Sequence, residues 1–271
     1  MSIFICPVCR ERFGMSEKSY VCPKSHSFDI SKSGYVNFLL SKHGAVHGDN
    51  KLMMRARRDF LEKGYYKPLC ESVCRVVSEY TQNSSILLDA GCGEGYYTSA
   101  VKSLFDQSDI SADMYGIDIS KYAVEAAAKR KMDISFAVAS VFRIPVQSES
   151  CDILLTMFAP YCSEEYRRVL KKDGYMIMTI PSENHLWELK KAIYDTPYKN
   201  EVKPYELEGF IYSGAERINF TMKIDNKTDI QNLFSMTPYY YKTGRTEQER
   251  LNNLEYLETQ ADFEILIYKK I

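Results

Sequence analysis

The chain has 271 residues, of which 45% are hydrophobic, and this size suits one large α/β domain with a small additional module. No run of about 18 apolar residues occurs, so no membrane span is expected, and the N-terminus does not resemble a secretory signal. The eight cysteines lie in a metal-like pattern or in apolar and glycine-rich settings, which favours a reduced, cytoplasmic protein over a disulfide-bonded one.

The net charge of −1 conceals an asymmetry along the chain. Residues 1–68 contain 12 Lys and Arg against 6 Asp and Glu, whereas the remainder is acidic. Because a basic segment attracts polyanions whatever the total charge, we expect the N-terminal part to face a nucleic acid.

A small metal-binding module is predicted within residues 1–35. Three cysteines and a histidine follow the spacing C-x2-C-x12-C-x3-H, namely Cys6, Cys9, Cys22 and His26. Thiolate and imidazole ligands in this number suit tetrahedral zinc, and four protein ligands leave no open position for catalysis. About 30 residues cannot build an adequate core alone, so we expect structural zinc to stabilise the module. The alternative is a disulfide or chance clustering.

Residues 36–80 are predicted to link this module to the main domain through two helices. The first runs from Asn50 to Glu62 and ends before Gly64; the second runs from about Leu69 to Tyr80 with one apolar face. The first helix carries three arginines, which either contact RNA phosphates or form a solvated charged face: Arg55, Arg57 and Arg58.

The most informative segment is an apolar run, Ile86 to Leu88, followed by Asp89 and a glycine-rich loop. Its glycines occupy alternate positions, Gly91, Gly93 and Gly95. Glycine is needed where the backbone turns tightly and approaches a ligand, because a Cβ would collide. The spacing G-x-G-x-G differs from the dinucleotide fingerprint, which disfavours a nicotinamide enzyme. It resembles the S-adenosylmethionine loop of the seven-stranded, Rossmann-like class I methyltransferases.

That resemblance implies roles for several residues. In such enzymes the acid before the glycines lies near the methionine moiety, and a second acid after the next strand binds the ribose hydroxyls. Asp118 has the second position, and Ser120 is placed to cap the next helix. Many of these enzymes contact adenine through an acid where this chain has Ser140. Two further loop residues are expected to contact the cofactor, Glu94 and Tyr96.

Residues 81–271 are therefore predicted to form the methyltransferase domain. Further strands are expected at five places: 134–138, 151–156, 175–180, 210–220 and 263–268. The strand at 151–156 leads into Phe158-Ala159-Pro160-Tyr161, at the edge where an open α/β sheet receives its substrate. Enzymes that methylate exocyclic amines often carry Asn/Asp-Pro-Pro-Tyr there, so this segment disfavours such a target. Cys162 is interpreted as a buried cysteine rather than a nucleophile.

The chain as a whole resembles the bacterial 23S rRNA guanine-N1-methyltransferases. Matching motifs span nearly its full length: Cys6-Pro7-x-Cys9, Tyr20-x-Cys22-Pro23, Gly34-Tyr35-Val36-Asn37, Met53-Met54-x-Ala56-Arg57-Arg58, Gly91-Cys92-Gly93-Glu94-Gly95, His185-Leu186-x-Glu188-Leu189 and Met236-Thr237-Pro238. The resemblance implies a zinc module that recognises an rRNA hairpin near the peptide exit tunnel, methyl transfer to N1 of one guanine, and a homodimer. It also places Tyr66 and His185 near the cofactor.

Guanine N1 carries a proton at neutral pH, so its methylation needs a general base or a polarised O6. The sequence does not identify a catalytic residue. His185 is a weak candidate for the general base, and cofactor positioning or ordinary packing is its alternative role. The target base must leave its stack, and Tyr240 either stacks on it or belongs to the core.

Two other functions stay open at this point. One is methyl transfer to a small molecule or a protein, with the zinc module serving assembly only. The other is a non-catalytic zinc-containing RNA-binding or ribosome-assembly protein, which the intact glycine loop disfavours. Within the family reading, both a housekeeping role and macrolide resistance are consistent with the motifs.

Overall fold

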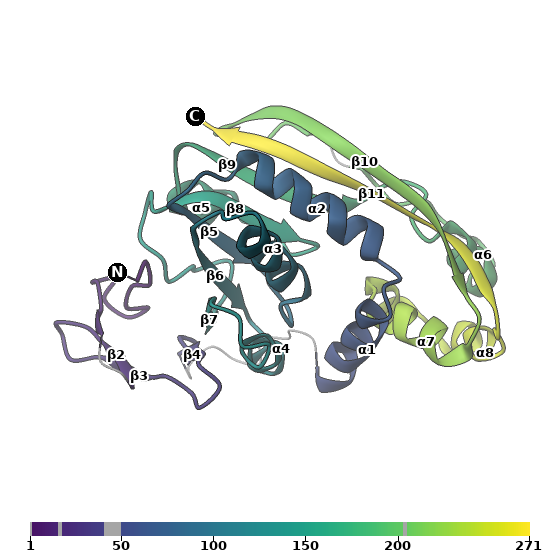
Figure 1. Ribbon diagram of the computed structural model, residues 1–271. Coiled ribbons are helices and arrows are strands. Elements are labelled where there is room, and N and C mark those ends of the chain that lie inside the picture. The colour runs from purple at the N-terminus through teal and green to yellow at the C-terminus, as the bar shows by residue number, and fades with distance from the viewer. Residues whose placement is uncertain (1, 16–17, 41–49, 203–204) are drawn as a thin grey trace.

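The computed structural model describes residues 2–15, 18–40, 50–202 and 205–271. Within these ranges the centre is an eight-stranded sheet in the order β10-β11-β9-β8-β5-β6-β7-β4 (Figure 1). Its strands are β4 (Val36–Asn37), β5 (Ser85–Ala90), β6 (Ala112–Asp118), β7 (Ser135–Val138), β8 (Cys151–Met157), β9 (Leu170–Pro181), β10 (Phe210–Ile224) and β11 (Leu257–Lys270). Strands β4 to β9 pair in parallel, whereas β11 is antiparallel to both β9 and β10. The seven-stranded Rossmann-like prediction is confirmed, and β4 adds an eighth strand at the edge.

Helices cover both faces of the sheet. They are α1 (Lys51–Glu62), α2 (Lys67–Tyr80), α3 (Tyr96–Gln107), α4 (Lys121–Ala128), α5 (Ser163–Val169), α6 (Trp187–Ile193), α7 (Lys227–Ser235) and α8 (Arg245–Asn252), with a 3-10 turn η1 (Pro238–Lys242). The side-chain oxygen of Asn50 accepts hydrogen bonds from the first turn of α1, and that of Ser120 accepts one from Ala123 of α4. Both helix starts follow from these caps.

Adjacent apolar residues of each central strand pack on opposite faces of the sheet, since successive side chains point to opposite sides. Leu87 of β5 packs with α2 and α3, whereas its neighbour Leu88 packs with α5 and the N-terminal module. Both leucines are fully buried. This explains why the parallel strands are continuous apolar runs rather than alternating ones.

The N-terminal module shares the core of the second face. It contains a three-stranded antiparallel sheet, β1 (Gly14–Met15), β2 (Ser19–Val21) and β3 (Ser27–Asp29). Phe4 bridges to Val146, and its ring lies 5.2 Å from that of Tyr115 on β6. The boundaries 1–35, 36–80 and 81–271 stay a prediction, and β4 joins the first part of the predicted linker to the main sheet.

The long hairpin of β10 and β11 extends away from the zinc-ligand end of the molecule, and α6, α7 and α8 lie at its far end (Figure 1). Helix α1 packs against α7, so residues from distant parts of the sequence meet there. Among the described helices, none is long and apolar enough to cross a membrane.

Candidate metal centre and cofactor site

The four predicted zinc ligands form one cluster. Their ligand atoms all lie within 4.8 Å of one another. Sγ of Cys22 is 3.3 Å from Nδ1 of His26 and 3.6 Å from Sγ of Cys9, and Cys6 Sγ is 3.5 Å from the same nitrogen. Three sulfurs and one imidazole nitrogen at this separation fit tetrahedral zinc.

Two tight turns present these ligands. The backbone N–H of Arg10 donates to the carbonyl of Cys6, and the N–H of Ser25 donates to that of Cys22, each over 2.8 Å. Arg10 and Ser25 have φ of 64° and 61°, so each turn closes through a left-handed residue. The two turns thereby bring the ligand residues of separate segments together.

The glycine loop has the backbone that only glycine adopts readily. Gly91 and Gly95 have φ of 90° and 79°. A Cβ on Gly91 would lie 2.4 Å from Cβ of Ala159, and one on Gly95 would lie 3.0 Å from Cβ of Ala127. The loop therefore packs closely against Ala159 and Ala127, and its glycine backbone is accessible in the way that close approach of a ligand requires.

Two acids flank this loop. Asp89 is 1% exposed; its Oδ2 accepts from Thr98 over 2.5 Å, and its Oδ1 is buried without a hydrogen-bond partner. Burial raises the pKa of Asp89 to about 7, against the lowering effect of Thr98. Asp118 accepts hydrogen bonds from the backbone N–H groups of Gly93 and Ser120, at 3.0 and 2.8 Å. The partnerless oxygen of Asp89 and the bare loop fit the methionine end of S-adenosylmethionine.

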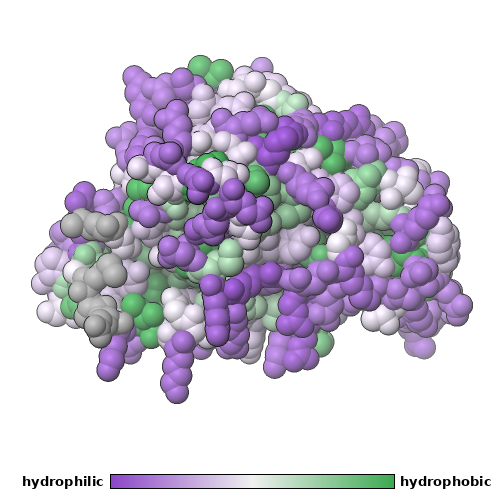
Figure 2. All heavy atoms as spheres, viewed as in Figure 1, coloured by the Kyte–Doolittle hydropathy of each residue, from purple (hydrophilic) through white to green (hydrophobic). Residues whose placement is uncertain are grey.

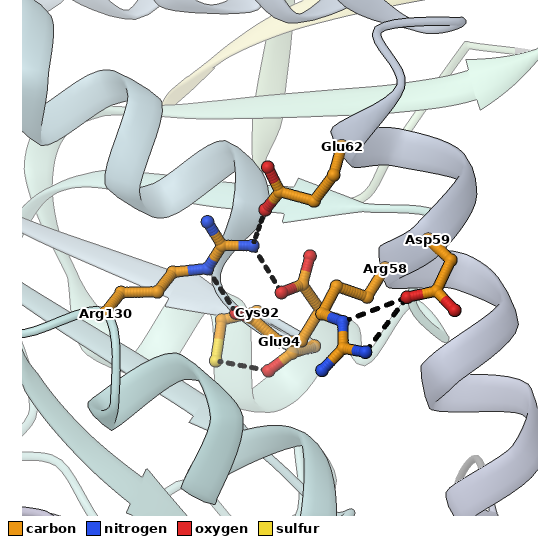
Figure 3. Close-up of polar contacts among 7 residues, drawn as sticks. Arg58, Asp59, Glu62, Cys92, Glu94 and Arg130 are labelled. Carbon is orange, nitrogen blue, oxygen red and sulfur yellow. Dashed lines mark hydrogen bonds and ion pairs between the residues drawn. The ribbon is translucent and has the colours of Figure 1, made fainter.

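Three other residues predicted to contact the cofactor, Ser140, Glu94 and Tyr96, lie in different surroundings. Ser140 follows β7, directly after Ala139, whose N–H donates to the carbonyl of Asp118 over 2.9 Å. The Glu94 carboxylate instead faces Arg130 in an ion pair, and Arg130 also reaches Glu62 (Figure 3). Tyr96 lines a surface hollow with Cys70 and Arg130. Ser140 is thus next in sequence to a residue that contacts Asp118, the acid predicted to bind the ribose.

Tyr66 and His185 meet although 119 positions separate them. The hydroxyl of Tyr66 lies 3.5 Å from Nε2 of His185, and both side chains are buried. The N–H of Asp262 donates to Nδ1 of His185 over 3.2 Å, and burial lowers the pKa of His185 to about 3. The ring is therefore neutral, and its proton is assigned to Nε2, facing Tyr66.

The predicted RNA-binding residues divide into two groups. Arg55 and Arg58 are exposed, and both line a groove of about 470 Å³ between α1 and α4; Arg58 pairs with Asp59 (Figure 3). Arg57 is half-buried, and its guanidinium donates to the carbonyl of Met236 over 3.4 Å. Tyr240 is 39% exposed, 6.3 Å from the ring of Phe234. Figure 2 shows hydrophilic side chains along the lower edge, where Figure 1 places α4 and α1.

One residue that sequence reasoning did not select stands out at the end of β8. Phe158 has φ of 57°, unusual for a non-glycine residue, yet 46% of it is exposed. Its ring lies 5.5 Å from that of Phe263, which in turn lies 4.3 Å from His185. Its neighbour Ala159 presses on Gly91 of the glycine loop. The sequence does indicate an aromatic residue at the substrate edge of the sheet. It does not indicate the left-handed backbone of Phe158, which only the structure shows.

Comparison with known proteins agrees with this geometry. Residues 82–237 match the family described as "Methyltransferase domain", and residues 4–43 match the zinc-ribbon family described as "RlmA, N-terminal". The chain is 31% identical to the Bacillus subtilis protein named "Putative 23S rRNA (guanine-N(1)-)-methyltransferase YxjB", over 99% of this chain and 98% of that protein. It is 28% identical to the "23S rRNA (guanine(748)-N(1))-methyltransferase" of Streptomyces fradiae, over 82% of this chain and 80% of that protein.

Among solved structures, the YcgJ protein of Bacillus subtilis shares the fold. The TM-score is 0.52 at 18% identity, and the match covers 74% of this chain and 97% of that one. The methyltransferase sheet, the glycine loop and the S₃N cluster thus occur together in one chain with full-length relatives. The chain belongs to the 23S rRNA (guanine-N1-)-methyltransferase family, the S-adenosylmethionine-dependent enzymes that carry an N-terminal zinc ribbon.

Proposed function

We propose that this protein transfers the methyl group of S-adenosylmethionine to N1 of a guanine in a 23S rRNA hairpin near the peptide exit tunnel. The observation that carries the proposal is the union of a zinc ribbon and a methyltransferase domain in one chain, with similarity to a named relative over 99% of its length. Full-length similarity includes both the cofactor site and the module expected to recognise RNA.

S-adenosylmethionine supplies an electrophilic methyl group on its sulfonium sulfur. The contribution of this chain is to align guanine N1 with that methyl group, and alignment alone accounts for much of the rate enhancement in such transfers. Asp89 would receive the cofactor's ammonium through its partnerless oxygen, and Asp118 would bind the ribose. Ser140, which follows β7, would contact the adenine end.

We assign His185 a positioning role rather than that of a base. Its Nδ1 accepts from the Asp262 N–H, and its Nε2 carries the proton. Neither nitrogen is then free to take a proton from guanine. The ring would instead orient the hydroxyl of Tyr66. The family resemblance implies that both residues lie near the cofactor.

The target guanine would stack on Phe158. This exposed ring lies at the carboxyl end of β8, where open α/β sheets bind substrates. Backbone strain at an exposed aromatic is more typical of a functional site than of a packing site. Tyr240 is the second aromatic candidate, on η1 beside α1.

The RNA backbone would cross the groove between α1 and α4. Five basic residues and three glutamates line it together with the exposed ring of Tyr122. They are Lys51, Arg55, Arg58, Lys129 and Arg130, and Glu62, Glu94 and Glu125. Lysine and arginine side chains bind phosphates without reading sequence, and the zinc module would add recognition of the hairpin.

We propose in addition that the enzyme is a cytoplasmic homodimer. Light scattering of the purified protein tests the oligomeric state.

The decisive experiment is primer extension on 23S rRNA from a strain lacking this activity, incubated with protein and S-adenosylmethionine. N1 methylation blocks base pairing, so we expect one new stop immediately 3′ of a guanine. A reaction without the methyl donor and one with Asp118→Ala protein are the controls. Methyl transfer to RNA without a stop would contradict the N1 assignment. Transfer only to protein or small molecules, or no binding of S-adenosylmethionine, would overturn the proposal in favour of the other functions considered.

A second assay, the inhibitory concentration of macrolides, tests the biological role. If the stop falls in the tunnel hairpin, expression of the gene in a sensitive host should also raise the inhibitory concentration of tunnel-binding macrolides. An unchanged inhibitory concentration with full methylation would assign the modification to ribosome maintenance instead of resistance.

A further inference from the structure

Arg57 differs from the two arginines beside it on α1. It lies four residues after Met53 and three before Phe60, both buried, so it belongs to the inner face of the helix. Arg55 and Arg58 are exposed toward the α1–α4 groove, whereas Arg57 is half-buried. Its position is therefore poorly suited to a phosphate contact on the surface.

The Arg57 guanidinium faces the glycine loop. A Cβ built on Gly93 would have Nη1 of Arg57 as a neighbour at 3.9 Å, and Nη2 donates to the Met236 carbonyl at 3.4 Å. Burial raises the pKa of Tyr66 and Tyr97, and the nearby positive charge of Arg57 works against that rise. The charge thus lies among the residues that surround the predicted cofactor site.

Two further arginines lie near the loop and contact carboxylates. Arg130 is held by Glu94 and Glu62, and Arg58 pairs with Asp59 (Figure 3). Arg57 approaches the loop at Gly93, where a backbone without a side chain lets a ligand come close.

The methionine end of S-adenosylmethionine carries one ammonium and one carboxylate. The partnerless oxygen of Asp89 suits the ammonium, and a carboxylate is bound best by the planar fork of an arginine. We propose that Arg57 binds the α-carboxylate of the methionine moiety. Asp89 and Arg57 would then bind the two ends of the zwitterion, and Arg57 would connect α1 to the bound cofactor.

This assignment links the two substrates through one helix. Arg57 faces the cofactor while Arg55 and Arg58 face the groove proposed for RNA. The inference rests on the proposed function only for the identity of the methyl donor, and its test needs no RNA, so failure of rRNA methylation and failure of this assignment are distinguishable.

The experiment is calorimetric titration of the zinc-loaded full chain with two ligands. S-adenosylhomocysteine has the carboxylate, and decarboxylated S-adenosylmethionine lacks it. We expect Arg57→Met to weaken S-adenosylhomocysteine binding on the order of 10- to 100-fold, the range for a charge-assisted hydrogen bond. The affinity for the decarboxylated ligand should change less than about twofold. Arg57→Lys, which keeps the charge but not the fork, should fall between.

Arg58→Met is the matched control, because it removes a guanidinium one residue away that pairs with Asp59. It should leave both affinities unchanged. If Arg57→Met lowers the affinity for both ligands equally, Arg57 acts only by holding the segment around Met236 through its hydrogen bond. This result would overturn the proposal. Unchanged affinity for both ligands, with RNA binding lost, would reassign Arg57 to a phosphate contact.

Discussion

The backbone N–H of Asp262 donates to Nδ1 of His185 over 3.2 Å, so a residue of the C-terminal strand sets the tautomer of this buried ring. The Asp262 carboxylate, itself fully buried, accepts two hydrogen bonds from Arg217 at 2.9 and 2.7 Å. Arg217 lies on β10 and Asp262 on β11. The hairpin thereby holds His185, which contacts Tyr66 in the proposed cofactor site.

The first prediction concerns acid stability. Burial lowers the pKa of His185 from 6.5 to about 3. Between these two pH values the unfolded chain binds a proton at His185 and the folded chain does not. Stability is therefore fully present above pH 6.5 and falls as the pH drops toward 3. One pKa unit corresponds to about 1.36 kcal/mol, so the contribution between pH 7.5 and pH 5 is roughly 2 kcal/mol. Urea unfolding at these two pH values measures it.

His185→Gln is the control for this prediction, because glutamine cannot titrate. The variant should be less stable at pH 7.5 but should lose about 2 kcal/mol less than the wild type on acidification. An identical loss in both proteins would show that other groups carry the pH dependence.

The second prediction concerns zinc. Cys22→Ser should weaken metal binding and unfold the N-terminal module, because structural zinc supplies on the order of 10 kcal/mol in small modules. Phe4 and Tyr20 of this module pack into the second face of the core, so hydrogen exchange should rise there and in β6. Metal analysis and exchange mass spectrometry would show both effects. Cys162→Ser, outside the cluster, should keep one zinc per chain; loss of zinc from it as well would contradict the assigned ligands.

The third prediction concerns the glycine loop. Gly91→Ala combines a left-handed alanine with a Cβ 2.4 Å from Cβ of Ala159, so it should cost about 2–4 kcal/mol and reduce cofactor binding. Gly214→Ala also has positive φ but meets nothing within 4 Å, so it should cost less. Denaturant unfolding and calorimetry provide both quantities.

The double variant Gly91→Ala with Ala159→Gly removes the second methyl group. It should recover part of the lost stability and binding if the clash is the cause. A double variant no better than Gly91→Ala would place the whole cost in the backbone conformation.

The sheet was predictable because buried parallel strands are long apolar runs that need no tertiary knowledge. β4 was not, since the two residues Val36 and Asn37 carry no periodic pattern, and their pairing with β7 depends on where the N-terminal module docks. The zinc ligands were readable from spacing alone, because ligand chemistry restricts both residue type and separation.

The site was only partly predictable for a related reason. Arg55, Arg57 and Arg58 look alike in the sequence, and helical periodicity relative to Met53 and Phe60 was the signal that separates Arg57 from the others. Glu94 was expected near the cofactor from its place in the loop, yet its carboxylate faces Arg130, 36 residues away. The φ of Phe158 has no sequence signature, since nothing local demands it.

The last prediction tests Phe158 as the surface on which guanine stacks. Phe158→Ala should lower kcat/KM for rRNA on the order of 10- to 100-fold, because stacking of one base is worth about 1–3 kcal/mol. Cofactor affinity should not change, and Phe158→Tyr should keep most of the activity. Single-turnover methylation of an rRNA hairpin and calorimetry with S-adenosylhomocysteine measure these effects. Tyr240→Ala is the parallel variant; lower stability with unchanged RNA affinity would assign Tyr240 to packing.

Phe158→Gly separates function from packing at the same position. Glycine accepts φ of 57° without strain, so relief of roughly 1 kcal/mol should offset much of the lost contact with Phe263. A ring kept for stacking predicts a variant about as stable as the wild type but far less active. A ring kept for packing predicts the reverse, with stability reduced and methylation of the hairpin near the wild-type rate. The second result would assign guanine stacking to Tyr240 on η1 instead of Phe158.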